Sequence, residues 1–149
     1  MAAKSDAFAH DMLALIFNGA AISGLADNAA SGALADLYLA LHTADPSASG
    51  TQQSSETNYV GYARQAVART SAGFVVSSPP SPKVTLNSQV NFPDPAAGTS
   101  AQTITHWSVG VAGSGATEIL YRGPVSPVVP ISVGLAGPAL ATGTTITEV

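Results

Sequence analysis

The chain has 149 residues and a net charge of −4, and only 9% of its residues are charged, against about 25% in an ordinary soluble domain. The net negative charge argues against electrostatic binding of nucleic acid, which needs clustered Lys and Arg. The absence of cysteine excludes disulfides and thiolate metal sites. So few charges leave apolar patches that favour association with neighbours, and the alternative is a secreted or periplasmic monomer covered by Ser and Thr.

The first predicted element is a helix at residues 6–18. Ser5 or Asp6 can accept hydrogen bonds from the first free amides, and the Asn18-Gly19 pair can end the helix in a left-handed turn. Four apolar residues recur on one stripe of this helix: Phe8, Met12, Leu15 and Ile16. We expect this stripe to cover one opening of a β core, or to reach a neighbouring subunit.

The longest apolar stretch, residues 12–26, is interrupted by Asn-Gly and Ser-Gly pairs and is shorter than the roughly 20 residues that span a bilayer. Asp6, His10 and Asp11 stand where the uninterrupted apolar region of a signal peptide should begin. We therefore expect neither a membrane partner nor secretion. Residues 19–35 have no clean period, and they form either a second short helix around residues 22–30 or a surface loop.

Residues 37–43 are predicted to form a strand, because Leu37, Leu39 and Leu41 fall on one face. A polar excursion follows at residues 47–58. It is either a mobile binding loop, or a solvated hairpin tip or ordered intersubunit contact. Arg64 follows this loop, and it can pair with an acidic residue of a partner or with one of three residues that would hold the loop: Asp36, Asp45 or Glu56.

Further strands are predicted at residues 60–69, 73–77, 83–87, 89–92, 103–112, 117–122, 128–133 and 144–148. Eight or nine short strands after one helix predict a mainly β fold, a jelly-roll-like antiparallel β-sandwich with an N-terminal α-helix. Trp107 shares a face with Val109 and Val111, and it is expected to anchor the core. The other expected core residues are Val75, Val84, Leu86, Phe92, Ile119, Tyr121, Val129, Ile131 and Ile146.

The C-terminal segment carries prolines at positions 124, 127 and 130, a spacing that suits an edge strand or an extended arm better than a central strand. Such an arm could add its edge to a neighbour's sheet. We expect a single domain over residues 1–149, since a domain of this length buries about two-thirds of its unfolded surface. Within it we distinguish an N-terminal helical segment (1–35), a β core (36–122) and Pro-rich C-terminal strands or an arm (123–149).

A search for catalytic motifs finds little. His10, His42 and His106 lie on separate predicted elements without metal-binding spacing, so each is interpreted as a polar surface or strand residue. The Gly113-Ser114-Gly115 run lacks the spacing of a nucleophile elbow and is typical of a hairpin turn. We therefore predict no catalytic, cofactor or metal site, and we expect that the protein is not an enzyme.

One part of the sequence resembles a known family. The runs LALHTADP (residues 39–46) and GYARQAV (residues 61–67), with VNFP (90–93) and THWSVG (105–110), are similar to a family of small virion proteins of tailed bacteriophages. The resemblance covers roughly residues 35–122. Members of the family are often labelled tail-fibre-like, and some resemble head decoration or cement proteins that clamp capsid subunits. The resemblance thus implies a phage virion structural protein.

From these observations we expect a capsid decoration or cement protein on the outer surface of the phage head, which stabilises the head by bridging major capsid subunits. Its partners would be the major capsid protein and further copies of itself in a small homo-oligomer. The alternative is a tail or tail-fibre-associated protein that contacts the host surface, and a glycan-binding or hydrolytic β-sandwich comes third. The candidate partner-contact residues are Phe8, Met12, Tyr62, Arg64, Gln65, Val128 and Val129.

Overall fold

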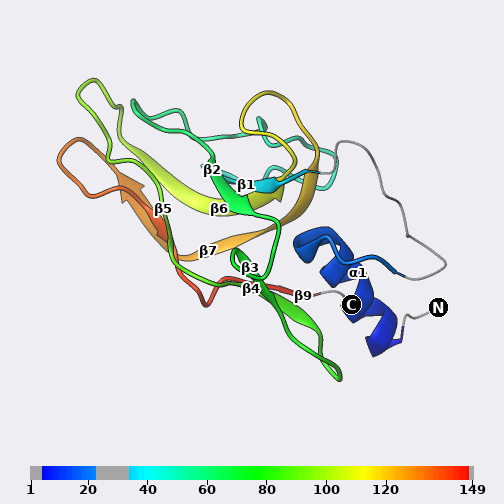
Figure 1. The fold of residues 1–149 in the computed structure, drawn as a ribbon. Helices are drawn as coiled ribbons and strands as arrows, with labels where there is room; N and C mark the ends of the chain where they lie inside the picture. Colours follow the sequence, from blue (N-terminus) through cyan, green and yellow to red (C-terminus); the bar gives the residue numbers. More distant parts are fainter. Residues whose placement is uncertain (1–4, 23–33, 148–149) are drawn as a thin grey trace. The chain divides into compact units, whose positions relative to one another are not determined.

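The computed structural model describes residues 5–22 and 34–147, which belong to two compact units (Figure 1). The first unit is drawn from Met1–Asp36, Val67–Gln89 and Ala141–Val149, and the second from Leu37–Ala66 and Val90–Leu140. These units are defined by contacts and not by independent folding, so the single domain stays a prediction. The second helix predicted around residues 22–30 falls mostly outside the described residues.

The helix of the first unit, α1 (Asp6–Asn18), has the predicted bounds because both of its ends are capped locally. The Ser5 hydroxyl accepts a hydrogen bond from the amide of Phe8 at 3.3 Å, which satisfies one of the free amides of the first turn. Gly19 follows the helix at a φ of 64°, a left-handed conformation that glycine adopts without a Cβ clash.

The stripe that α1 buries differs from the predicted one. Ala9, Leu13 and Phe17 are buried at a spacing of four residues, whereas Phe8 is 40% exposed and Met12 is half-buried. The helix carries two neighbouring apolar stripes, and its weak amphipathic pattern does not choose between them. The choice comes from the strands on which the helix packs.

These strands form an antiparallel sheet in the order β3-β4-β9, made of β3 (Phe74–Val76), β4 (Lys83–Leu86) and β9 (Thr145–Thr147). Phe74 is buried on the helix side, with its ring 4.9 Å from that of Phe17. The predicted core residues Val84, Leu86 and Ile146 are confirmed. The prediction for Val75 is wrong, because this residue lies on the opposite face and is 43% exposed.

The second unit contains most of a four-stranded sheet in the order β2-β1-β6-β7 (Figure 1). Its strands are β1 (Asp36–His42), β2 (Gln65–Ala68), β6 (Gln102–Gly110) and β7 (Ile119–Ile131), and a smaller sheet pairs β5 (Val90–Asn91) with β8 (Ala139–Leu140). The fold is therefore mainly β, with antiparallel sheets and an N-terminal helix, as predicted. The described strands form sheets of four, three and two, and the jelly-roll arrangement stays a prediction.

Strand β7 joins two segments that we predicted as separate strands, residues 117–122 and 128–133. It is the edge strand of its sheet, where proline is tolerated because no neighbour needs its missing N–H group. Ile104 of β6 lies opposite Val129, whereas His106, two residues later, lies opposite Pro124, five residues earlier. The strand therefore holds three extra residues at this point, and residues 125–128 form a large irregular bulge. Strand β8 was not predicted.

Both faces of the central strands β1 and β6 are covered in the described structure. Leu37, Leu39, Leu41 and Trp107 are buried as predicted, with Trp107 only 6% exposed. The expected core residues Phe92 and Ile131 are buried too, while Ile119, Tyr121 and Val129 are half-buried. On the second face, His42 and Ser108 are fully buried although both are polar. The polar loop at residues 47–58 contributes to this burial, and there the candidate site lies.

Candidate functional site

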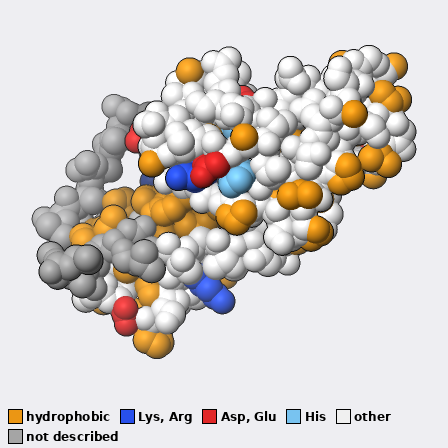
Figure 2. Space-filling model, turned by 180° about the vertical axis from the view of Figure 1, so that it is seen from behind, with side chains coloured by type: hydrophobic (Ala, Val, Ile, Leu, Met, Phe, Trp, Pro, Cys, Tyr) orange, Lys and Arg blue, Asp and Glu red, His pale blue; other side chains and the backbone are white. Residues whose placement is uncertain are grey.

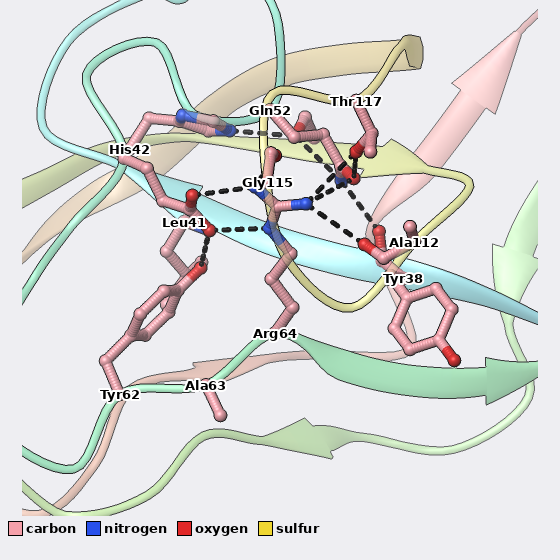
Figure 3. Close-up of polar contacts among 12 residues, drawn as sticks. Tyr38, Leu41, His42, Gln52, Tyr62, Ala63, Arg64, Ala112, Gly115 and Thr117 are labelled. Carbon is pink, nitrogen blue, oxygen red and sulfur yellow. Dashed lines mark hydrogen bonds and ion pairs between the residues drawn. The ribbon is translucent and has the colours of Figure 1, made fainter.

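Arg64 lies at the centre of a buried polar cluster in the second unit (Figure 3). Its side chain is only 2% exposed, and its Nε and Nη2 atoms donate to the two carboxylate oxygens of Glu56 at 2.7 and 2.8 Å. Two parallel bonds of this kind are the strongest that an arginine makes with a carboxylate. Of the three acidic partners that the sequence offered, the structure selects Glu56, and the pair holds the loop.

The remaining donors of Arg64 reach a second loop, between β6 and β7. Nη1 donates to the carbonyl of Ala112 at 3.0 Å and to the hydroxyl of Thr117 at 3.1 Å, and Nη2 donates to the carbonyl of Gly115 at 2.7 Å. One guanidinium thus joins the 47–58 loop to the 112–117 loop. Because these bonds and the Glu56 pair occupy the guanidinium, Arg64 acts here as an internal tie.

Gln52 links this cluster to the central strands. It is fully buried, and its carbonyl oxygen accepts from Arg64 at 3.2 Å and from Thr117 at 3.1 Å. Its amide nitrogen donates to the backbone oxygen of Tyr38 at 2.9 Å and to the Ser108 hydroxyl at 3.4 Å. Every hydrogen-bonding position of the amide is therefore used. Position 110 must be glycine, since a Cβ there would lie 2.3 Å from the Gln52 amide.

His42 closes the far side of the cluster. It is fully buried on β1, with Nδ1 2.9 Å from the carbonyl of Ser54 and Nε2 2.8 Å from the hydroxyl of Ser108. Burial lowers its pKa below the ordinary value of 6.5. His42 is thus a strand residue, as expected, but one that the interior keeps neutral. His106, also on a strand, is half-buried beside the Thr105 hydroxyl, and His10 lies on α1.

Tyr62 completes the cluster from the segment before β2. Its hydroxyl donates to Glu56 at 3.0 Å and accepts from the amide of Leu41 at 3.1 Å, while its ring stacks on that of Phe92. Burial raises the pKa of Tyr62 far above its usual range. This tyrosine therefore stays neutral and donates to the same carboxylate that Arg64 binds.

The chemistry of the cluster favours a structural role. Ser108 and His42 have the separation of a nucleophile and its base, but both are fully buried, and the second ring nitrogen of His42 faces a carbonyl and not a carboxylate. Within residues 5–22 and 34–147, no group of three His, Asp or Glu side chains is arranged to hold a metal ion. No helix in these ranges is long and apolar enough to cross a bilayer.

The 47–58 loop is ordered by its own unit. Gln52 and Thr57 are buried, and their backbone amides donate to the carbonyls of Thr117 and Leu41 at 2.8 and 3.0 Å. These contacts hold the buried side of the loop against its own unit, while Ser47, Ala48 and Ser49 are exposed. A binding loop, a solvated tip and an intersubunit contact all stay predictions. A shallow groove of about 450 Å³ lies beside the loop, lined by Ser47, Ala48 and residues 119–122. Arg122, one of the lining residues, forms an ion pair with Asp45.

The predicted contact residues do not form one site. Tyr62 and Arg64 meet in the cluster, and Gln65 is half-buried at the start of β2, with its amide nitrogen donating to the carbonyl of Ala63. Val128 is 53% exposed in the bulge of β7, and Val129 beside it is half-buried. Phe8 and Met12 belong to the other unit, on α1. Their role in partner contact stays a prediction.

Sequence reasoning missed Gln52, Ser108 and Thr117 as members of the cluster. The available signal was the run of small residues on the second face of the central strands, where Ala40, Ser108 and Gly110 leave room for a covering loop. We interpreted that face only as the opposite of the leucine face. The identity of the covering residue has no local signal, because it depends on a loop that returns from elsewhere in the chain.

The comparison with known families agrees with the sequence resemblance. Residues 3–145 match the family described as Podophage GP4 fiber I protein gp80. A comparison with curated proteins gave no match. The family match covers almost the whole chain, and it confirms the expected phage virion structural family with a tail-fibre-like label. The chain therefore belongs to the Podophage GP4 fiber I protein gp80 family of phage structural proteins, and its place is in the virion.

Proposed function

We propose that the protein is a non-enzymatic component of a phage fibre, which acts by binding its neighbours in the virion and not by making or breaking bonds. The observation that carries this proposal is the match of residues 3–145 to a family whose description names a fibre protein. The Arg64 cluster supports it, because a tied, rigid loop pair can present a contact surface at little entropic cost.

The surface of the second unit supplies candidate contacts. Its large hydrophobic side chains with substantial exposure are Val60, Val128, Val133 and Leu135. Three of these fall within eight residues at and after the β7 bulge. Figure 2 shows one face, where hydrophobic side chains lie among uncharged polar ones and charged side chains are sparse. Apolar side chains without a surrounding ring of charge favour burial against another protein.

Capsid decoration is the second candidate, and one observation favours it. The described residues belong to two compact units and show no long repeated shaft, which suits a protein that binds a lattice at a junction. Such a ligand would stabilise the head by binding only the assembled shell, and many copies would multiply a modest interface. Its partners would be the major capsid protein and further copies of this chain, on the outer surface of the head.

The number of copies per virion separates the two candidates. Quantitative mass spectrometry of purified particles should find at most a few tens of copies for a fibre component, and a copy number near that of the capsid protein for a decoration protein. Deletion of the gene should reduce adsorption to the host in the first case and weaken the shell in the second. Particles that keep both properties without the protein would contradict both candidates.

A surface variant tests where the contact lies. Val128→Asp places a charge at the β7 bulge, and we expect fewer copies in the virion than with the native residue. Val75→Asp is the matched control, since Val75 is a valine of similar exposure in the first unit. Equal incorporation of the two folded variants at native levels would contradict the choice of the β7 surface.

A further inference from the structure

His42 is enclosed in a way that depends on its protonation state. The carbonyl oxygen of Ser54 can only accept, so the Nδ1 atom of His42 carries the hydrogen of the neutral ring and donates to it. The Nε2 atom is then an acceptor, and the Ser108 hydroxyl, which also accepts from Gln52, donates to it. A neutral ring with its hydrogen on Nδ1 satisfies all of these groups.

A second proton on the ring has no acceptor in this arrangement. It would sit on Nε2 and face the hydroxyl hydrogen of Ser108. That hydroxyl would then have to rotate away from Nε2, the atom to which it donates in the described structure. The ring is fully buried, so the charged form would also lose its hydration. The most direct relief is to let water reach the ring, and the segment that covers it is the loop at residues 51–57.

The charged and titratable groups around the ring add to this cost. The Glu56 carboxylate would attract the charge and the Arg64 guanidinium would repel it, but Glu56 is already bound by Arg64 and by the Tyr62 hydroxyl. His106 stands directly opposite His42 in the register of β1 and β6. A proton on His106 would place two like charges across from each other, a destabilising pair in a sheet.

Asp45 and Arg122 are two further charged residues to consider around His42. They bind each other, and Asp45 also interacts with His106. Its carboxylate accepts from the backbone amide of Ser47, and this bond, followed by the contacts with Arg122, lowers the pKa of Asp45. The pair is largely self-neutralising, so it does not supply a free carboxylate for His42.

We propose that the 51–57 loop is a pH-sensitive latch, closed over a neutral His42 and released when this histidine takes up a proton. The bonds that close it come from backbone and side-chain groups of the loop: Gln52 N to Thr117 O, Thr57 N to Leu41 O, His42 Nδ1 to Ser54 O, and the Glu56 bonds to Arg64. Release would expose Gln52 and Arg64, which are both buried in the closed form.

The direction of the pH effect follows from the buried base. Because burial lowers the pKa of His42 in the closed loop below 6.5, the open form binds more protons between the two pKa values. The closed loop therefore has its full stability above about pH 6.5 and loses it as the pH falls through the pKa of the enclosed His42. Acid opens the latch, and return to neutral pH closes it.

An NMR titration of the whole protein from about pH 8 to about pH 4, combined with amide hydrogen exchange, tests the latch. We expect His42 to titrate below the ordinary histidine value of 6.5, because burial lowers its pKa. At the same midpoint, the amides of Gln52 and Thr57 should lose at least about tenfold protection, after correction for the intrinsic pH dependence of exchange. Loop amides that stay protected while His42 is protonated, or a His42 that does not titrate in this range, would overturn the proposal.

Two variants isolate the group responsible. His42→Gln can donate to Ser54 and accept from Ser108 without titrating, so its loop should stay closed over the whole range. His106→Gln keeps the latch but removes a group that opposes a proton on His42, so the pKa of His42 should rise and the midpoint of opening should move to higher pH. Loop release at an unchanged pH in a folded His42→Gln protein would refute the assignment. If that variant does not fold, the titration of the native protein decides alone.

Discussion

The two compact units are stabilised in different ways. In the first, α1 packs on β3 and β4, and the residues that it buries, Ala9, Leu13 and Phe17, are all apolar. In the second, one face of the central strands is covered by a polar loop that Gln52 and Arg64 tie down. Apolar packing is non-directional and tolerates changes of shape. A satisfied polar cluster is directional, and the loss of one member leaves the others unpaired in a medium of low dielectric.

This difference predicts a large effect for Arg64→Met. The substitution leaves the Glu56 carboxylate mostly buried without its positive partner, and we expect the second unit to lose about 3–5 kcal/mol of stability. Urea unfolding, followed by the fluorescence of the buried Trp107, measures this loss.

Arg122→Met is the control for that experiment. Arg122 also pairs with an aspartate, but its side chain is 31% exposed, and exposed pairs contribute at most about 1 kcal/mol. The double variant Arg64→Met with Glu56→Gln should recover part of the loss, since it removes the unpaired charge. Equal effects of the Arg64 and Arg122 substitutions would show that the cluster is not a cooperative polar core.

The first unit offers a second large effect, through packing alone. Leu13→Ala should cost about 2–5 kcal/mol, because Leu13 is fully buried under α1 and the cavity can relax only in part. Phe8→Ala on the exposed stripe should change stability by less than about 0.5 kcal/mol. Hydrogen exchange of the β3 and β4 amides reports both changes. A larger effect at Phe8 than at Leu13 would mean that the sequence-predicted stripe is the one that matters.

The helix shows which features the sequence could predict. Its bounds follow from Ser5 and Gly19, because caps are local interactions between residues three to five positions apart. The buried stripe does not follow, since Phe8 and Leu13 are both apolar and only the facing strands select one of them. The strands were found from alternation for the same local reason, but proline at 124, 127 and 130 suggested a break in what is one edge strand.

The cluster shows the same limit at the level of side chains. Glu56 was one of three acidic partners predicted for Arg64, because Arg64 follows the loop that contains Glu56 and the two carry opposite charges. Gln52 and Thr117 were not, because a neutral amide has many possible partners and 65 residues separate these two. Sequence patterns identify charge pairs and periodic faces, whereas neutral polar contacts depend on backbone positions that only the fold supplies.

Gly110→Ala tests the polar cluster of the second unit with a smaller expected loss of stability than Arg64→Met. A Cβ at this position would lie 2.3 Å from the Gln52 amide and 2.5 Å from the carbonyl of Glu118, so either the amide or the strand must move. We expect a loss of about 1–3 kcal/mol and faster exchange of the Gln52 amide. Gly143→Ala, where a Cβ meets nothing within 4 Å, is the control. An unchanged exchange rate for Gln52 would show that its position is not set by strand β6.

A third arginine, Arg69, lies in the first unit five residues after Arg64 in sequence, and a small effect is expected there. Its Nε and Nη2 atoms donate to the carbonyls of Ile16 and Leu15 at 2.6 and 2.5 Å, and α1 has no basic residue of its own in its last turn. A positive charge there opposes the negative end of the helix dipole, so Arg69→Met should cost about 1 kcal/mol.

Arg69→Lys tests whether charge or geometry carries this contribution. Lysine keeps the charge but lacks the planar fork that reaches two carbonyls at once, so recovery of most of the stability would assign the effect to the dipole. Little recovery would assign it to the paired hydrogen bonds. Whichever of the two contributes, the loss of Arg69 should speed amide hydrogen exchange in the last turn of α1 and leave it unchanged in the 51–57 loop. Arg69 donates to neutral carbonyls at a helix end, so its loss leaves uncharged acceptors, whereas the loss of Arg64 leaves a carboxylate that is largely shielded from water.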